Sequence, residues 1–68
     1  MYVLSIILKE LLKERKLTYK SFAAQIGIST SSITNYIRYN KLPTLTTLVA
    51  MADYFNCSTD YLLFGKKN

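Results

Sequence analysis

Hydrophobic residues recur along this chain with the spacing of one face of an α-helix, beginning at Leu4. Positions 4, 7, 8, 11 and 12 are apolar, and lysines and glutamates occupy positions 9, 10, 13 and 14. Apolar residues at i, i+3, i+4 and i+7 form a stripe along one side of a helix. The pattern therefore predicts a first amphipathic helix that ends near Lys16.

A second, shorter helix is predicted between a capping residue and a glycine. Thr18 stands where the side chain of an N-cap residue accepts a hydrogen bond from the backbone of the first turn. Gly27 suits the left-handed conformation in which many helices end. Between them Phe22, Ala23 and Ile26 share one face, and we expect this face to point into the core.

The stretch GISTSSITNY, residues 27–36, resembles a flexible linker in composition, yet its residues separate by face. If residues 30–38 are helical, the apolar Ile33, Tyr36 and Ile37 lie together at i, i+3 and i+4. Ser29 is then placed to cap this third helix by accepting from the amide of residue 31 or 32. The opposite, polar face consists of Ser31, Thr34, Asn35 and Arg38.

A fourth helix is predicted after Pro43, because proline disfavours helix at the residue before it and Thr44 is a suitable N-cap. Asn56 ends this helix. Its predicted buried stripe consists of Leu45, Leu48, Val49, Ala52 and Phe55, with Met51 near the edge.

A fifth helix, residues 59–64, is predicted between the cap Ser58 and the stop Gly65. The chain has neither the alternating pattern typical of strands nor an internal repeat. The predicted fold class is therefore all-α, with one domain over residues 1–65 and a short basic tail over residues 66–68.

The composition agrees with one small folded domain. A chain of 68 residues buries only about 60% of the surface that its unfolded form exposes, so its apolar residues must serve a single core. The one cysteine, Cys57, has no partner for an internal disulfide, which is typical of a reducing compartment. We expect it to be a buried structural thiol.

The apolar run YVLSIIL, residues 2–8, is too short to span a membrane. It also lacks the preceding basic region and the following cleavage site of a signal peptide. We therefore expect a cytoplasmic protein.

The net charge of +5 is unevenly distributed. No Asp or Glu occurs between Glu14 and Asp53. A contiguous basic segment suits a polyanion such as nucleic acid or an acidic membrane surface, although charge that serves only solubility would give the same composition. The basic residues of this window are Arg15, Lys16, Lys20, Arg38 and Lys41.

An enzyme is not expected. The chain has no histidine, one cysteine and four carboxylates, and it lacks a glycine-rich loop that could hold a phosphate. No arrangement of a nucleophile and a base emerges from these residues. We expect no cofactor, no metal and no small-molecule ligand.

The second helix, the turn beginning at Gly27 and the third helix together form a helix-turn-helix pattern. In such a unit the later helix, here the third helix of the chain at residues 30–38, enters a DNA major groove about 12 Å wide. Short side chains that form hydrogen bonds therefore suit the exposed face of this helix. Ser, Thr and Asn meet both requirements.

Residues 4–65 resemble the Cro/CI-type (Xre-like) helix-turn-helix family of phage and bacterial repressors. The resemblance is carried by LKELLKERKLT (8–18), FAAQIGISTSSITNY (22–36) and PTLTTLVAMADYFNCSTDYLL (43–63). It implies a five-helix lambda-repressor-like domain that docks its third helix in the major groove, usually as a homodimer. The implied partner is a double-stranded DNA operator of near-palindromic sequence, and the implied protein is bacterial or phage-encoded and associated with the nucleoid. The positions that fit the family spacing are Ala23, Gly27, Ile33, Tyr36, Pro43, Leu48 and Leu62.

The resemblance also assigns contact residues. Those matching base-contacting positions are Thr30, Ser31, Thr34 and Asn35. Those assigned to phosphate contacts are Tyr19, Lys20, Ser32, Arg38, Tyr39, Asn40 and Lys41. Asn35 is the strongest base reader, because an amide bonds bidentately to adenine. Leu63 and Phe64 either close the core or contribute to a dimer interface.

The sequence departs from the family in two places. Many members have a buried Arg–Glu pair where this chain has Leu12 and Ile37, and an apolar pair replaces a buried ion pair at little or no cost. Tyr39 stands where glycine is common. Either the loop takes another path, or Asn40 adopts the left-handed conformation instead.

Two other binding functions are compatible with the sequence. One is a protein-binding module of the same fold, antitoxin-like or partner-sensing, with weak or no specific DNA binding. The other is attachment to an anionic membrane through the first helix, although so small a domain needs the apolar face of that helix for its core.

Overall fold

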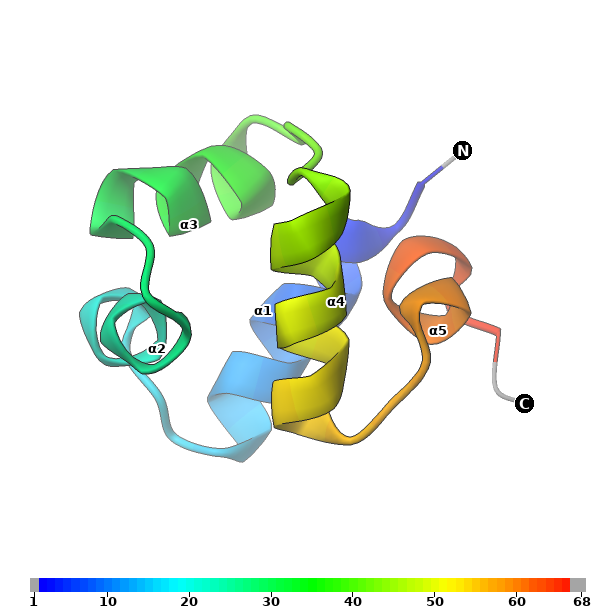
Figure 1. Cartoon of the computed structure of the whole chain (residues 1–68), viewed down its shortest axis with the longest axis horizontal. Coiled ribbons are helices and arrows are strands. Elements are labelled where there is room, and N and C mark those ends of the chain that lie inside the picture. The colour runs from blue at the N-terminus through cyan, green and yellow to red at the C-terminus, as the bar shows by residue number, and fades with distance from the viewer. Residues whose placement is uncertain (1, 67–68) are drawn as a thin grey trace.

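The computed structural model describes residues 2–66, and this part of the chain folds into helices without a strand (Figure 1). α1 crosses the back of the molecule behind α4, with α2 and α3 on one side and α5 on the other (Figure 1). The predicted all-α class is therefore confirmed. The helices are α1 (Leu4–Glu14), α2 (Tyr19–Ile26), α3 (Thr30–Arg38), α4 (Leu45–Phe55) and α5 (Thr59–Phe64).

The four predicted N-caps are all formed by hydroxyl side chains. Thr18 Oγ1 accepts from the amide of Ser21 at 3.0 Å, and Ser29 Oγ accepts from the amide of Ser32 at 3.2 Å. Thr44 and Ser58 accept in the same way from the amides three residues later, at 3.3 and 3.0 Å. Each bond satisfies a backbone donor that a helix leaves unpaired in its first turn.

α2, α4 and α5 end at residues in the left-handed conformation. The three predicted helix ends, Gly27, Asn56 and Gly65, have φ of 77°, 55° and 72°, and the left-handed conformation predicted for Gly27 is confirmed. Lys16 also has a positive φ, 56°, and the amide of the next residue, Leu17, donates to Leu12 O at 2.9 Å. This is the bond of a Schellman motif, and it turns the chain sharply from α1 toward α2.

The core forms where all five helices meet. An aromatic cluster joins α2 to α4: the Phe22 ring centroid lies 5.1 Å from that of Phe55 and 5.4 Å from that of Tyr54. Aromatic pairs at such distances contribute beyond the area that they bury. The buried residues are Leu4, Leu8, Leu12, Phe22, Ala23, Ile33, Leu48, Met51, Ala52, Phe55 and Leu62.

The expected stripe of α4 is wrong at three positions. Leu45 is 74% exposed and Val49 43% exposed, whereas Met51, expected at the edge, is fully buried. The helix is apolar on more than one side, so periodicity leaves its rotation undecided. The packing of α4 against α2 and α5 decides it and turns residues 48, 51, 52 and 55 inward.

The N-terminal segment is fastened to α5. The amide of Val3 donates to Leu63 O at 2.7 Å, and the rings of Tyr2 and Phe64 lie 5.5 Å apart. Leu63 is half-buried against the core, whereas Phe64 remains 45% exposed. Within residues 2–66, no helix is long and apolar enough to cross a bilayer.

Candidate nucleic-acid interface

α2, a tight turn and α3 form one packed unit. The turn begins at Gly27, and the amide of Ile28 donates to Ala23 O at 3.0 Å. Ser29 then starts α3, while Ile33 is fully buried and fixes the inner side of that helix to the core. The stretch that resembles a linker is therefore an ordered helix-turn-helix.

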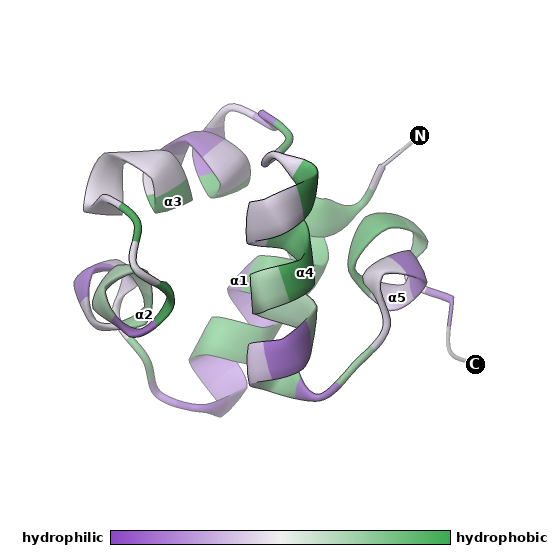
Figure 2. Ribbon diagram, in the orientation of Figure 1, coloured by the Kyte–Doolittle hydropathy of each residue, from purple (hydrophilic) through white to green (hydrophobic). Residues whose placement is uncertain are grey.

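The outer side of α3 presents short polar side chains. Thr30 and Ser31 are exposed, and Thr34 and Asn35 are half-buried. Figure 2 shows α3 mostly near white or purple, in contrast to the green of the central helices. This surface has both the short side chains and the hydrogen-bonding groups that a helix needs inside a major groove.

Two hydroxyls near this surface are already committed within α3. Thr34 Oγ1 donates to Thr30 O at 3.2 Å, so its proton is used within the helix and its methyl group and lone pairs are left for other contacts. Ser32 Oγ lies 2.9 Å from Ser29 Oγ and belongs to the cap. A role for Ser32 at a phosphate would have to coexist with this capping bond.

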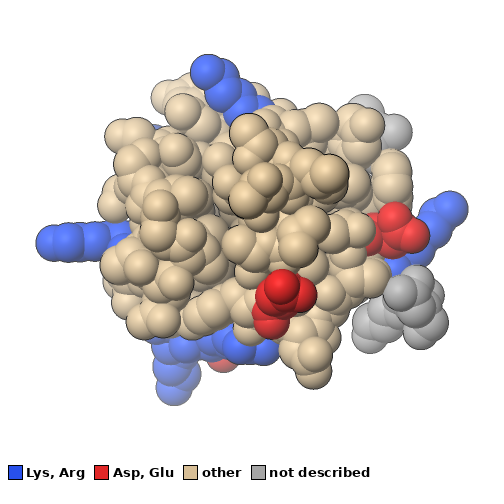
Figure 3. Space-filling view, viewed as in Figure 1, with Lys and Arg blue, Asp and Glu red and all other residues tan. Residues whose placement is uncertain are grey.

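Cationic groups flank the polar face. Lys20 on α2, Arg38 in the last turn of α3 and Lys41 in the following loop are all exposed. Tyr19 is half-buried against the core. In Figure 3, basic side chains project from the margins of the molecule, and the most prominent acidic groups on this face lie over α4 and α5.

Arg15 has a structural role that its place in the basic window does not predict. Its Nη2 donates to Phe55 O at 3.4 Å, and its guanidinium carbon lies 5.0 Å from the Phe55 ring centroid and 5.9 Å from that of Tyr54. A cation placed over aromatic rings at a helix C-terminus is favourable for both reasons. Arg15 therefore joins α1 to α4, and only the folded structure brings these residues together.

Asn40 adopts the left-handed conformation in the loop between α3 and α4. Its φ is 55°, whereas Tyr39 has an ordinary φ of −113°. The amides of Tyr39 and Lys41 both donate to Asn35 O at 3.1 Å. Of the two predicted alternatives, the one with Asn40 at positive φ is correct, and Tyr39 carries no left-handed strain. The side chain of Tyr39 is 66% exposed.

Leu12 and Ile37 lie on helices that pack against each other. Leu12 is 2% exposed, and Ile37 is half-buried against the same core. An isolated charge at position 12 would have no water to solvate it. The apolar character of both positions is consistent with the replacement of an ion pair.

The sequence predicts that Cys57 is buried, whereas in the structure Cys57 is half-buried and packs against the core. Burial raises the pKa of its thiol, and the nearby charge of Arg15 acts in the opposite direction. A raised pKa lowers the fraction of reactive thiolate at neutral pH. No group of three or more potential ligands among His, Cys, Asp and Glu is close enough to hold a metal ion in the described residues.

Comparison with known proteins gives a consistent result. The family model HTH_3, described as helix-turn-helix, matches residues 8–62. The uncharacterized HTH-type transcriptional regulator YobD of Bacillus subtilis (strain 168) is 41% identical over 56 residues, which cover 82% of this chain and 50% of YobD.

Two other proteins of the same organism are similar over 90% of this chain. The uncharacterized HTH-type transcriptional regulator YqaE is 34% identical over 61 residues, and the alignment covers 53% of it. The HTH-type transcriptional regulator ImmR is 36% identical over 65 residues, and the alignment covers 51% of it. The chain thus spans about half the length of these relatives.

Proposed function

The chain belongs to the Cro/CI-type helix-turn-helix family of transcriptional regulators, and we propose that it is a sequence-specific repressor that binds double-stranded DNA. Its proposed biological setting is a phage or another mobile element. Repression would follow from occupation of an operator, which excludes RNA polymerase from the promoter.

The observation that carries the proposal is the two-sided construction of α3. Ile33, which has no exposed surface, anchors one side of the helix to the core. Thr30 and Ser31 are exposed on the other side. A helix fixed in this way presents hydrogen-bonding groups without having to reorder before it binds. We propose that α3 enters the major groove with its N-terminal and central residues toward the bases.

Base reading is assigned to Thr30, Ser31, Thr34 and Asn35. Asn35 would pair bidentately with an adenine, and the methyl groups of Thr30 and Thr34 would contact thymine methyl groups. Contacts to phosphates fix the position of the protein on the duplex without reading sequence. They are assigned to Tyr19, Lys20, Ser32, Arg38, Tyr39, Asn40 and Lys41.

The proposed assembly on DNA is a two-fold homodimer. Dimers of helix-turn-helix proteins bind half-sites about 34 Å apart, one turn of the duplex. A near-palindromic operator would then mirror the symmetry of the protein.

Selection of bound duplexes from a random pool, followed by gel shift, tests this function. We expect enrichment of one half-site motif, repeated in inverted orientation at a spacing of one helical turn. Absence of binding to any duplex at low salt would overturn the DNA-binding function and favour a protein-binding module of the same fold.

A matched pair of variants connects the result to α3. Thr30→Glu should stay folded, because an acidic residue in the first turn of a helix is favourable, and should lose DNA binding through repulsion by the phosphates. Ile6→Glu introduces the same negative charge at an exposed first-turn position of α1 and should bind DNA like the wild type. Equal binding by both variants would show that α3 is not the contact helix.

A further inference from the structure

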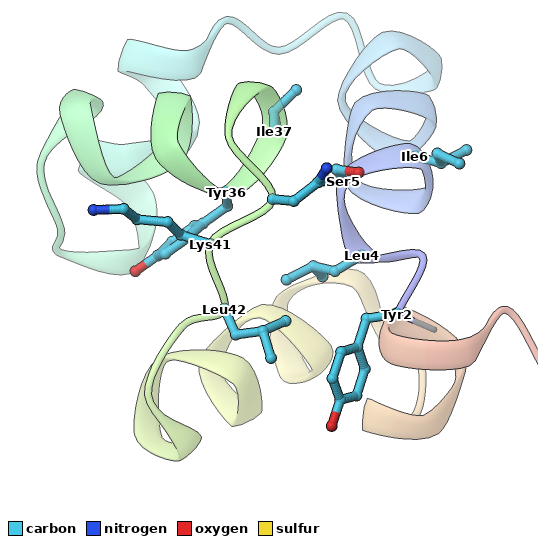
Figure 4. A pocket seen from close by; sticks show the side chains of 9 residues that line it. Tyr2, Leu4, Ser5, Ile6, Tyr36, Ile37, Lys41 and Leu42 are labelled. Atoms are coloured by element: carbon cyan, nitrogen blue, oxygen red, sulfur yellow. The ribbon is translucent and has the colours of Figure 1, made fainter.

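An open groove separates the N-terminal end of α1 from the loop that follows α3. Its volume is about 720 Å³, which lies within the range of about 300–1,000 Å³ that is typical of small-molecule sites. The lining side chains come from two segments, residues 2–6 and residues 36–42. Figure 4 shows Leu4 and Leu42 reaching into the space between these two segments.

The middle of the groove is apolar. Leu4 is only 2% exposed and forms part of the floor, and Ile37 of α3 is half-buried. Leu42 stands at the rim and is 48% exposed. A ligand with an apolar body gains free energy here, because binding removes its surface and these side chains from water.

One end of the groove carries positive charge. Lys41 is exposed and belongs to the lining, and among the described residues that line the groove none is acidic. In Figure 4, Lys41 and Tyr36 lie toward one end of the groove and Tyr2 lies toward the other. The flexible stem of a lysine allows its ammonium to reach a ligand at that end.

The sequence around the groove reinforces this charge. The first acidic residue of the chain is Glu10, and no Asp or Glu occurs between Glu14 and Asp53. Both lining segments are therefore free of acids, and an anion in the groove meets no neighbouring carboxylate from them. A DNA phosphate would use the cation but has no apolar surface for the middle of the groove.

We propose that this groove binds a small organic anion, a monocarboxylate with an apolar chain or ring. Its carboxylate lies at Lys41, and its apolar body lies along Leu4 and Leu42. We call the site the carboxylate groove. The sequence alone predicts no small-molecule ligand, because only the folded chain brings residues 2–6 beside residues 36–42.

Occupation of the carboxylate groove regulates DNA binding through Lys41, a consequence that rests on the proposed function. Lys41 is assigned to a phosphate contact, and a carboxylate beside its ammonium neutralises the charge that the phosphate needs. The two ligands therefore weaken one another, and linkage requires the same factor in both directions. A monocarboxylate would thus act as an inducer that releases the protein from its operator.

Nuclear magnetic resonance of the isotope-labelled full chain tests the site without DNA. Octanoate should shift the amide signals of residues 2–6 and 36–42. Octanamide, which lacks the charge, should bind about three- to tenfold more weakly. Acetate, which lacks the apolar chain, should bind at least about tenfold more weakly.

Three outcomes of this titration would overturn the site. One is a set of shifts confined to α4 and α5, where Leu45 and Phe64 are also apolar and exposed. Another is equal binding of octanoate and octanamide. The third is a shift of the groove amides when the protein alone is concentrated, which would mean that a second copy of the chain fills the groove.

Two matched pairs of variants locate the ligand. Lys41→Gln keeps the side chain but removes its charge and should weaken octanoate about three- to tenfold, whereas Lys13→Gln, exposed on α1 outside the groove, should bind octanoate like the wild type. Leu42→Asp should bind octanoate at least about tenfold more weakly, because it removes an apolar wall and adds a repelling charge. Its control is Leu45→Asp, exposed and outside the lining. Equal losses within either pair would overturn the assignment.

Gel shifts with and without octanoate separate the regulation from the function itself, with equimolar acetate in the reference samples. Saturating octanoate should weaken operator binding by the wild type to the level of Lys41→Gln, and it should leave the affinity of that variant unchanged. Unchanged operator binding by the octanoate-loaded wild type would overturn the inducer role. Absence of operator binding without octanoate would instead refute the DNA-binding function, whereas the shifts measured without DNA would still establish the carboxylate groove.

Discussion

Asn40 shows how one residue determines the path of the chain beside the proposed DNA contacts. Its positive φ, 55°, allows the amides of Tyr39 and Lys41 to share one acceptor, Asn35 O. Asparagine tolerates this conformation better than residues other than glycine. In this chain Tyr39 stands at the position where the family usually has glycine, but the left-handed residue is its neighbour, Asn40.

Replacing Asn40 tests whether it is this residue, and not Tyr39, that must adopt the left-handed conformation. Asn40→Ala should destabilise the domain by about 1–2 kcal/mol, because alanine is strained at positive φ. For a domain of this size each kcal/mol lowers the melting temperature by roughly 4–8 °C. Asn40→Gly and Tyr39→Gly should both avoid left-handed strain. A larger loss of stability for Tyr39→Gly than for Asn40→Ala would contradict the assignment.

Asn35 is the residue on which sequence reading depends most. Asn35→Ala should weaken binding to the selected operator by about 1–3 kcal/mol and relax the preference at one base pair. Fluorescence titration against the operator and its single-base variants measures both effects. A uniform loss of affinity over all duplexes would mean that Asn35 contacts the backbone instead.

At the scale of the element, α3 combines a structural start with a reading face. Ser29 caps the helix through the amide of Ser32 at 3.2 Å, whereas Ser31, two residues later, is exposed. Two serines of one short segment therefore have separate duties, one in stability and one in recognition.

Alanine substitutions should separate these duties. Ser29→Ala should lower the free energy of unfolding by about 1 kcal/mol, because an N-cap is lost. Ser31→Ala should leave thermal stability nearly unchanged and alter operator affinity. Circular dichroism melts of both variants, combined with gel shifts, provide the comparison, and equal stability of the two would refute the capping role.

For the whole molecule, stability depends on contacts between helices that are distant in sequence. Leu12 in α1 is buried in the same core against which Ile37 of α3 packs. Arg15, at the end of α1, reaches the last turn of α4 through Phe55 O. These contacts hold α1 against α3 and α4 and thereby fix the orientation of α3.

A double-mutant cycle tests the replacement of an ion pair at positions 12 and 37. Leu12→Arg should cost about 3–5 kcal/mol, because it buries a charge without a partner. Adding Ile37→Glu should recover part of that loss and, if the single variant is unfolded, restore a cooperative melt. Additive losses would show that the two positions are independent.

Salt dependence distinguishes the two arginines. Arg38→Ala should weaken binding to all duplexes alike and reduce the slope of log K against log salt by about one. Arg15→Ala should leave that slope unchanged and lower stability, by about 0.5–1 kcal/mol for the cation–π contact. An altered slope for Arg15→Ala would place this residue on the DNA.

Local signals in the sequence determined the helices and their ends. Thr18, Ser29 and Thr44 cap because a short hydroxyl side chain reaches the free amides of a first turn, and Gly27 stops α2 because glycine accepts positive φ at no cost. Such effects act within four residues, so they are visible before the chain folds. The polar face of α3 could be predicted for the same reason.

Tertiary packing decided what periodicity left open. Leu45 and Val49 are exposed and Met51 is buried because α4 rotates to fit α2 and α5, and a helix that is apolar on several sides carries no mark of that rotation. Arg15 meets the aromatic pair of α4 across 40 residues of sequence. Contacts of this range depend on how whole helices cross, which no local pattern encodes.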